Sequence, residues 1–332
     1  MTPCLKVRGL RTYFHSGWGV ARAVDGVDLE LGRGRTLGLI GESGCGKSLT
    51  ALSIMGLVDP PGRVESGSSI EFEGRQLVGL PEAEMEHVRG NEIAMIFQEP
   101  MSSLNPVYPI GYQVAEAVRA HEDVNRDLAR ARAIELLRMV HIPSPEQRAS
   151  DFPHQLSGGM RQRVMIAIAI ACRPHLLIAD EPTTALDVTV QAQVLSLLAE
   201  LKEKLDMALL LITHDLGVVA QLADEVAVMY AGRIVERGPL PATFAEPKHP
   251  YTEALLKSIP ALGLTKEHPL QVIAGNVPSP LSWPEGCRFS PRCEHVFDLC
   301  RNAYPDLAGT NGQAVACWLD RVGGSTRRSS SP

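Results

Sequence analysis

The chain has 332 residues, 45% of them hydrophobic and 21% charged, which fits a soluble globular protein of one large domain with an appendage, or of two medium domains. Its net charge of −6 argues against a nucleic-acid-binding protein, because such proteins usually present a basic surface. The longest apolar runs, VMIAIAIAC and MALLLI, are far shorter than the roughly 20 residues that cross a bilayer, and no signal-peptide core opens the chain, so we expect a cytoplasmic protein.

Short strands are predicted first. Residues 23–41 (AVDGVDLELGRGRTLGLIG) predict two strands around a glycine-rich turn, and residues 67–74 (GSSIEFEG) predict another strand. A helix is expected between them, from about Lys47 to Leu57. The beginning of the chain therefore predicts a β-rich layer that leads into a parallel sheet.

Helical patterns dominate from about residue 100 to residue 170. Residues 127–142 have apolar side chains at helical spacing, and residues 160–172 are apolar on almost all sides, which indicates a buried helix. Strands predicted at 175–180, 208–213 and 225–230 then alternate with helices predicted at 189–205 and 216–224. This alternation predicts an α/β fold with a parallel core sheet.

Proline becomes frequent past Gly238, so we place a domain boundary near residue 240. Residues 1–240 would form the main domain, with its helical part at about 100–170. Residues 241–332 would form a C-terminal extension, and its last residues (GGSTRRSSSP) are expected to be disordered.

A phosphate-binding motif lies between the second predicted strand and the first helix. GESGCGKS fits G-x-x-x-x-G-K-[ST] in the strand–loop–helix context that the motif requires, which disfavours a chance glycine-rich turn. Backbone N–H groups and the helix N-terminus would bind phosphate oxygens, Lys47 would reach the β- and γ-phosphates, and Ser48 would hold Mg²⁺. The predicted nucleotide-binding residues here are Gly41, Glu42, Ser43, Gly44, Cys45, Gly46, Lys47, Ser48 and Leu49.

Asp180 is the last residue of the buried strand LLIAD, and a second acidic residue, Glu181, follows it directly. Ligands bind at the carboxyl ends of strands in open α/β sheets. Asp180 would act on Mg²⁺, directly or through water, and Glu181 would orient and deprotonate an attacking water.

LSGGMRQR, which begins at Leu156, closely resembles the signature loop of the ATP-binding cassette (ABC) family. Alone, Ser157, Gly158 and Gly159 would read as a flexible turn, but their spacing to the Asp180 strand also resembles that family. The resemblance implies that these three residues contact a nucleotide.

Further positions match the family's motifs. Gln98 in IAMIFQEP resembles its Q-loop glutamine, which also binds Mg²⁺, and Asp187 in TTALD resembles its D-loop aspartate. His214 in LLITHD resembles its switch histidine, which contacts the γ-phosphate. Phe14, with Tyr13 as the alternative, lies where the family has an aromatic residue stacked on adenine.

The resemblance implies an ATPase whose catalytic residues are Glu181, His214 and Gln98. In this family each ATP lies between the phosphate loop of one cassette and the signature loop of another. The chain has one of each, so it must pair with itself or, as we expect, with a paralogous ATPase subunit.

QEPMSSLNP, HPYTEALLKSIP and the long stretch from Arg163 to Gln193 resemble the ATP-binding subunits of dipeptide and oligopeptide importers. The resemblance implies two membrane permease subunits, contacted by the segment after Gln98, and an external peptide-binding protein. It also implies a peripheral location on the cytoplasmic face of the inner membrane and no nucleic-acid partner. Without it, the segment after Gln98 would read as a solvated loop, and residues 249–260 as a short amphipathic helix.

Two other functions remain open from the sequence. An importer of nickel or of another small solute uses almost the same ATPase architecture. A soluble ABC ATPase acting on DNA or ribosomes usually has two cassettes, a long coiled coil or a basic surface, and none of these is visible in the sequence.

Four of the seven cysteines, Cys287, Cys293, Cys300 and Cys317, lie in the extension. In the cytoplasm such a group indicates metal binding rather than disulfides, but the spacing C-x₅-C-x₆-C-x₁₆-C differs from that of zinc ribbons. The extension of the importer family binds a [4Fe–4S] cluster and all four positions match, so the resemblance implies that cluster; zinc and unligated thiols are the alternatives. A bound group would stabilise this small extension, and a redox-sensing role stays open.

Overall fold

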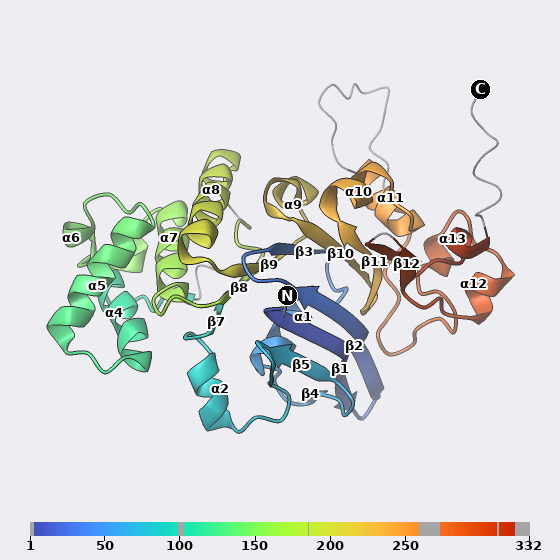
Figure 1. Cartoon of the computed structure of the whole chain (residues 1–332), viewed down its shortest axis with the longest axis horizontal. Coiled ribbons are helices and arrows are strands. Elements are labelled where there is room, and N and C mark those ends of the chain that lie inside the picture. The colour runs from blue at the N-terminus through green and yellow to red at the C-terminus, as the bar shows by residue number, and fades with distance from the viewer. Residues whose placement is uncertain (1–2, 99–102, 185, 259–272, 311, 323–332) are drawn as a thin grey trace. The chain divides into compact units, whose positions relative to one another are not determined.

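The computed structural model describes residues 3–98, 103–184, 186–258, 273–310 and 312–322 (Figure 1). The chain divides into two compact units. The first comprises residues 1–5, 30–36 and 71–212, and the second comprises residues 6–29, 37–70 and 213–332. Residues on both sides of position 240 belong to the second unit, so the boundary near residue 240 is a division along the sequence and stays a prediction.

A parallel sheet forms the centre of the first unit. Its strands are β7 (Ile93–Ile96), β8 (Leu176–Asp180) and β9 (Ala208–Thr213), and the last residue of β9 is counted in the second unit. Leu176 of β8 lies opposite Ile93 on one side and Ala208 on the other. β8 and β9 are buried along their whole length, as their continuous apolar runs require in a sheet covered on both faces. The strands predicted at 175–180 and 208–213 and their parallel pairing are confirmed, whereas β7 was not predicted.

Helices make up most of the rest of the first unit: α2 (Glu82–Val88), α4 (Ile110–His121), α5 (Arg126–Met139), α6 (Pro145–Arg148), α7 (Gly158–Ala169) and α8 (Val188–Leu205), with a 3₁₀ turn η1 at Pro153–Gln155. α4 to α7 form the green group of helices in Figure 1, and α5 contacts α4, α6 and α7. The predicted helices at 127–142, 160–172 and 189–205 are confirmed. Two of them, α5 and α7, end about three residues early; past the end of α5, the left-handed conformation of His141 turns the chain out of helical geometry.

The N-terminal strands of the second unit form an antiparallel layer. β1 (Leu5–Ser16) and β2 (Gly19–Leu31) are neighbours in one sheet, and β4 (Gly62–Val64) pairs antiparallel with β1, with Gly62 opposite Phe14. A hairpin of β5 (Ser69–Phe72) and β6 (Arg75–Gln76) then leads into the first unit. The predicted β-rich beginning of the chain is confirmed.

A second group of strands in this unit includes part of the C-terminal extension. β3 (Thr36–Ile40) pairs in parallel with β10 (Glu225–Tyr230), and β10 pairs antiparallel with β11 (Arg233–Pro239). β13 (Gln313–Val315) then adds to β11, and β12 (Ala308–Thr310) adds to β13. The sequence analysis did not predict β11, β12 or β13, and the last two have only three residues each. Residues of the extension thus continue the sheet that holds β3.

The helices of the second unit are α1 (Lys47–Met55), α9 (Leu216–Leu222), α10 (Leu240–Ala245), α11 (Pro250–Lys257), α12 (Asp298–Asn302) and α13 (Trp318–Val322), with a 3₁₀ turn η2 at Ser290–Arg292. α1 ends two residues earlier than predicted because Gly56 adopts a left-handed cap. Tyr230, Tyr251 and Phe289 pack together with Val219 and Val226 in a core cluster that strands and extension share.

In the described part of the chain, no helix has both the length and the apolar character needed to cross a membrane. The disorder expected for residues 323–332 falls outside the described residues.

Candidate nucleotide and cysteine sites

The phosphate loop connects β3 to α1, and its backbone requires glycine at two positions. Gly41 has φ +153°, and a Cβ there would lie 2.1 Å from the carbonyl oxygen of Met229. Gly46 precedes α1 with φ +106°, and a Cβ there would lie 2.7 Å from the carbonyl oxygen of Ala23. Any larger residue would displace the loop from the strands that support it.

Lys47 lies inside this loop and is 5% exposed. Its Nζ donates hydrogen bonds to the carbonyl oxygens of Gly41 at 2.8 Å and Glu42 at 3.0 Å. The ammonium is therefore held beside the backbone that the motif uses for phosphates. Cys45 is buried in the same loop, and burial raises the pKa of its thiol, which keeps it protonated and unreactive.

His214, directly after β9, lines a cavity of about 530 Å³ together with Gly41, Glu42 and Ser43. The structure thus brings the predicted switch histidine to the start of the phosphate loop. Gly275, Asn276 and Val277 of the extension line the same cavity. The sequence analysis missed these three residues, and no pattern in the local sequence marks them.

Tyr13 and Phe14 of β1 have different surroundings. The Tyr13 hydroxyl donates a hydrogen bond to Asp25 at 2.5 Å. Phe14 is half-buried, and a side chain at Gly62 would collide with its ring. Because the polar end of Tyr13 is already engaged, Phe14 remains the better candidate for stacking on a base.

Gln98 and Glu181 meet in the first unit. Gln98 Nε2 donates to Glu181 Oε2 at 3.1 Å, and Thr184 Oγ1 donates to the same oxygen at 2.9 Å. Glu181 is 8% exposed, and Asp180, the last residue of β8, is 3% exposed. These two donors fix the position of the Glu181 carboxylate oxygen. Thr184 was not predicted, although it stands in the TTALD stretch that was quoted for Asp187.

Ser157 and Asp187 cap neighbouring helices of the same unit. Ser157 Oγ accepts a hydrogen bond from the Met160 N–H, and Asp187 Oδ1 accepts one from the Val190 N–H. Ser157 and Gly158 are exposed, so the N-terminus of α7 is open to an anion from outside the chain. Gly159 lets α7 approach α8 closely, because a Cβ there would lie 2.5 Å from Val190 Cγ1.

The four cysteines of the extension line one small cavity of about 10 Å³ together with His249. Burial, together with the neighbouring thiols, raises the pKa of Cys287 to about 12 and also raises the pKa values of Cys293 and Cys317. Within the described ranges, no group of three or more His, Cys, Asp or Glu side chains is arranged to hold a metal ion. The four thiols therefore line one cavity but do not form a metal-binding group among the described residues.

His249 also lines this cavity, and its ring has one free donor. Its Nδ1 accepts the Tyr251 N–H at 3.0 Å, so the proton of the neutral ring is on Nε2. Burial lowers the pKa of His249 to about 3, so the ring is neutral at physiological pH. Among the described residues Nε2 has no hydrogen-bond partner, although His249 is 1% exposed. This N–H would fit an acceptor such as a metal-bound sulfur.

Comparison with known proteins identifies the family. Residues 24–184 match the family model of the ABC transporter, and residues 235–300 match that of the oligopeptide/dipeptide transporter C-terminal region. The oligopeptide transport ATP-binding protein AppD of Bacillus subtilis (strain 168) is 51% identical over 320 residues, covering 96% of this chain and 97% of AppD. The chain belongs to the ATP-binding subunits of oligopeptide and dipeptide ABC transporters.

Other relatives agree with this assignment. The dipeptide transport ATP-binding protein DppD of Escherichia coli (strain K12) is 51% identical over 303 residues, covering 91% of this chain and 92% of DppD. In a solved dimer of the cassette MJ0796 bound to ADP and Pi, one chain matches with a TM-score of 0.63 at 26% identity, covering 71% of this chain and 98% of that one. A second structure, cbiO1 from Clostridium perfringens, part of the ABC transporter complex cbiONQ, has a TM-score of 0.63 at 27% identity, with 74% and 92% coverage. The protein is an ABC ATPase that energises peptide import, and its cassette fold and this function were both predicted.

Proposed function

We propose that this subunit binds ATP on the loop from Gly41 to Leu49 and hydrolyses it only when a second cassette supplies its signature loop. The geometry of the loop supports this proposal most directly, since Lys47 is held where phosphates would lie. The exposed N-terminus of α7 supports the reciprocal role toward the partner's nucleotide. The second cassette would be a paralogous subunit, giving a heterodimer.

The chemistry requires few groups. Mg²⁺, held by Ser48, Asp180 and Gln98, would neutralise charge on the β- and γ-phosphates when bound. Glu181 would accept a proton from water while the water oxygen bonds to the γ-phosphorus and the bond to the β-phosphate oxygen breaks, leaving ADP and phosphate. Gln98 and Thr184 would hold the Glu181 carboxylate in place. His214 would contact the γ-phosphate, Phe14 would stack on adenine, and Asp187 would lie at the contact between cassettes.

Uptake of a labelled dipeptide by cells that lack this chain tests the proposal. We expect the native chain to restore uptake and the Lys47→Ala and Glu181→Gln variants to fail at native expression levels. Restored uptake with either variant would contradict the assigned chemistry. If cells lacking the chain show no uptake defect, the cargo is not a dipeptide, and nickel would be tested next.

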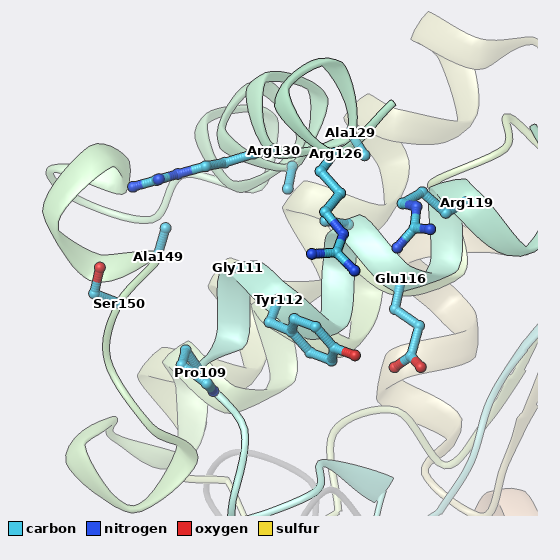
Figure 2. Close-up of a pocket in the computed structure, with 12 residues that line it drawn as sticks. Pro109, Gly111, Tyr112, Glu116, Arg119, Arg126, Ala129, Arg130, Ala149 and Ser150 are labelled. Carbon is cyan, nitrogen blue, oxygen red and sulfur yellow. The ribbon is translucent and has the colours of Figure 1, made fainter. Parts of the chain in front are cut away.

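We propose that a membrane permease subunit docks beside α4, where the chain is hollowed by a cavity of about 500 Å³ (Figure 2). Three arginines, Arg119, Arg126 and Arg130, line this cavity with one carboxylate, Glu116, and the exposed Tyr112 stacks on Tyr108 at its edge. This combination of cations and apolar rings fits a short cytoplasmic helix with carboxylates and an apolar face. The subunit would then sit peripherally on the cytoplasmic face of the inner membrane.

Charge reversal tests this docking surface. We expect Arg126→Glu to reduce co-purification with the permease subunits while ATP binding is unchanged. Arg138→Glu is the matched control, because Arg138 is on the same helix but pairs with Glu146 and does not line the cavity. Equal co-purification of both variants with the permease would contradict the proposal.

We also propose that Cys287, Cys293, Cys300 and Cys317 hold a [4Fe–4S] cluster. One shared cavity and the buried Nε2–H of His249 support a thiolate-bound group there. Zinc, the alternative, would be held by the same four thiolates at about 2.3 Å from a single ion. When bound, the cluster would supply folding free energy to the extension.

Anaerobically purified protein should absorb at about 400 nm and contain iron and sulfide in equal amounts. Stoichiometric zinc without iron would contradict the cluster proposal. Protein with neither metal but normal thermal stability would leave the cysteines as buried, unligated thiols.

A further inference from the structure

Arg292 of the C-terminal extension forms an ion pair with Glu42 inside the phosphate loop. Nη1 lies 2.7 Å from Oε2 and Nη2 lies 3.0 Å from Oε1, so two parallel hydrogen bonds join the groups. The Arg292 side chain is 4% exposed and Glu42 is 29% exposed. A doubly bonded pair with one buried partner is well ordered and only weakly screened by solvent.

The remaining donors of Arg292 fix the guanidinium in place. Nε donates to the carbonyl oxygen of Ala274 at 2.9 Å, and Nη2 also donates to that of Ile273 at 3.1 Å. Nη1 also reaches the Tyr230 hydroxyl at 3.3 Å. The extension and β10 thus orient the arginine before it meets Glu42.

Glu42 is bound to its surroundings through each of its polar groups. Its N–H donates to the hydroxyl of Tyr251, a fully buried residue of α11, at 2.9 Å. Its carbonyl oxygen accepts from Lys47 Nζ and from the Cys45 N–H. The extension therefore holds the same residue that holds the lysine of the phosphate loop.

A carboxylate in a phosphate loop is an electrostatic problem, because it repels the nucleotide that the loop must bind. The Arg292 guanidinium offsets this negative charge and turns the carboxylate toward the extension. We infer that the C-terminal extension is part of the nucleotide site, with Arg292 as the positioning residue that neutralises Glu42 and orders the phosphate loop for ATP. This inference rests on the proposed binding of ATP to this loop.

Equilibrium binding of MgATP to the purified full chain tests the inference. Arg292→Gln should weaken binding roughly tenfold, since one uncompensated charge then faces the phosphates and the ordered loop is less populated. Arg292→Lys should recover part of the affinity. The double variant Arg292→Gln with Glu42→Gln should bind within about twofold of Glu42→Gln alone, because the repelling charge is gone.

Two controls separate the possible failures. Lys47→Ala should abolish binding; if it does not, the proposed nucleotide site itself is wrong. Arg321→Gln removes an exposed arginine of the extension that donates to the Asp306 carbonyl oxygen and should leave affinity unchanged. If Arg292→Gln binds MgATP with native affinity, this inference is overturned, but the proposed nucleotide site is not. A loss of affinity that Glu42→Gln does not restore would also overturn the inference, because Arg292 would then act through the fold and not through Glu42.

Discussion

Glu181 shows how local geometry prepares one residue for its proposed role. Its backbone is left-handed at φ +48°, and its N–H donates to the carbonyl oxygen of Ile212 at 2.8 Å. Gln98 and Thr184 both donate to its Oε2. The carboxylate therefore accepts hydrogen bonds from one residue close in sequence, Thr184, and from one far away, Gln98.

Replacing Glu181 with Gln should slow ATP hydrolysis by roughly 10²–10⁴-fold, the usual effect of losing a proton acceptor. ATP binding should persist, because the phosphate loop is unchanged. Thr184→Val, which removes one hydrogen bond to the carboxylate, should cost up to about tenfold. Single-turnover hydrolysis in the assembled transporter measures both effects. Near-native rates for Glu181→Gln would exclude it as the base.

Asp25 links the N-terminal strands to the extension through Arg288, with Arg233 nearby at 3.2 Å. Burial alone would raise the pKa of Asp25, but the hydrogen bond from Tyr13 and the charges of both arginines lower it below its ordinary value of 3.8. The ionised carboxylate therefore contributes stability above pH about 4 that is lost as the pH falls through its lowered pKa.

We expect Asp25→Asn to reduce the free energy of unfolding by about 3–5 kcal/mol at pH 7, because Arg288 is left buried without its charge partner. The difference in free energy of unfolding between this variant and the native chain should narrow as the pH falls below about 4. Denaturant unfolding across a pH series measures this difference. Asp298→Asn, at an exposed carboxylate, is the control. A gap that stays constant down to low pH would contradict the charged pairing.

At the scale of elements, the close contact of α7 with α8 depends on Gly159 having no side chain. A methyl group at Gly159 would overlap Val190, whereas one at Gly158 would meet Leu186 Cδ2 at an ordinary 3.6 Å. The two adjacent glycines of the signature loop therefore have different structural requirements.

Gly159→Ala should lower the free energy of unfolding by about 1–3 kcal/mol, the cost of overpacking, whereas Gly158→Ala should change it little. Adding Val190→Ala to Gly159→Ala should recover most of the loss, because it removes the colliding methyl groups. Thermal or denaturant unfolding of the three variants measures this. Equal stability of Gly158→Ala and Gly159→Ala would show that the helices separate at no cost.

At the scale of the whole molecule, the chain provides one phosphate loop and one signature loop. If ATP lies between two cassettes, the hydrolysis rate per mole of the isolated chain should be low and should rise with chain concentration or with added paralogue. Mixing this chain carrying Ser157→Arg with a native partner should impair hydrolysis at the partner's phosphate loop. A high, concentration-independent rate for the monomeric chain would contradict the two-cassette mechanism.

Much of the fold was predictable because the strongest signals are local. The apolar runs at 176–180 and 208–213 became buried parallel strands, and GESGCGKS became a strand–loop–helix turn. The three-residue strands β12 and β13 were missed, since a strand of a few residues is defined by its partner rather than by its own composition, and the seven-residue β11 was missed as well.

The sequence by itself determined the family, the phosphate loop and the identity of most candidate site residues, because each depends on residue types at fixed spacing. Only the tertiary structure decided that Gln98 donates to Glu181, that His249 lines one cavity with the four thiols, and that Arg292 reaches Glu42 across 250 positions. Those contacts join segments that no local pattern relates. They exist because strand pairing and core packing bring distant side chains within hydrogen-bonding range.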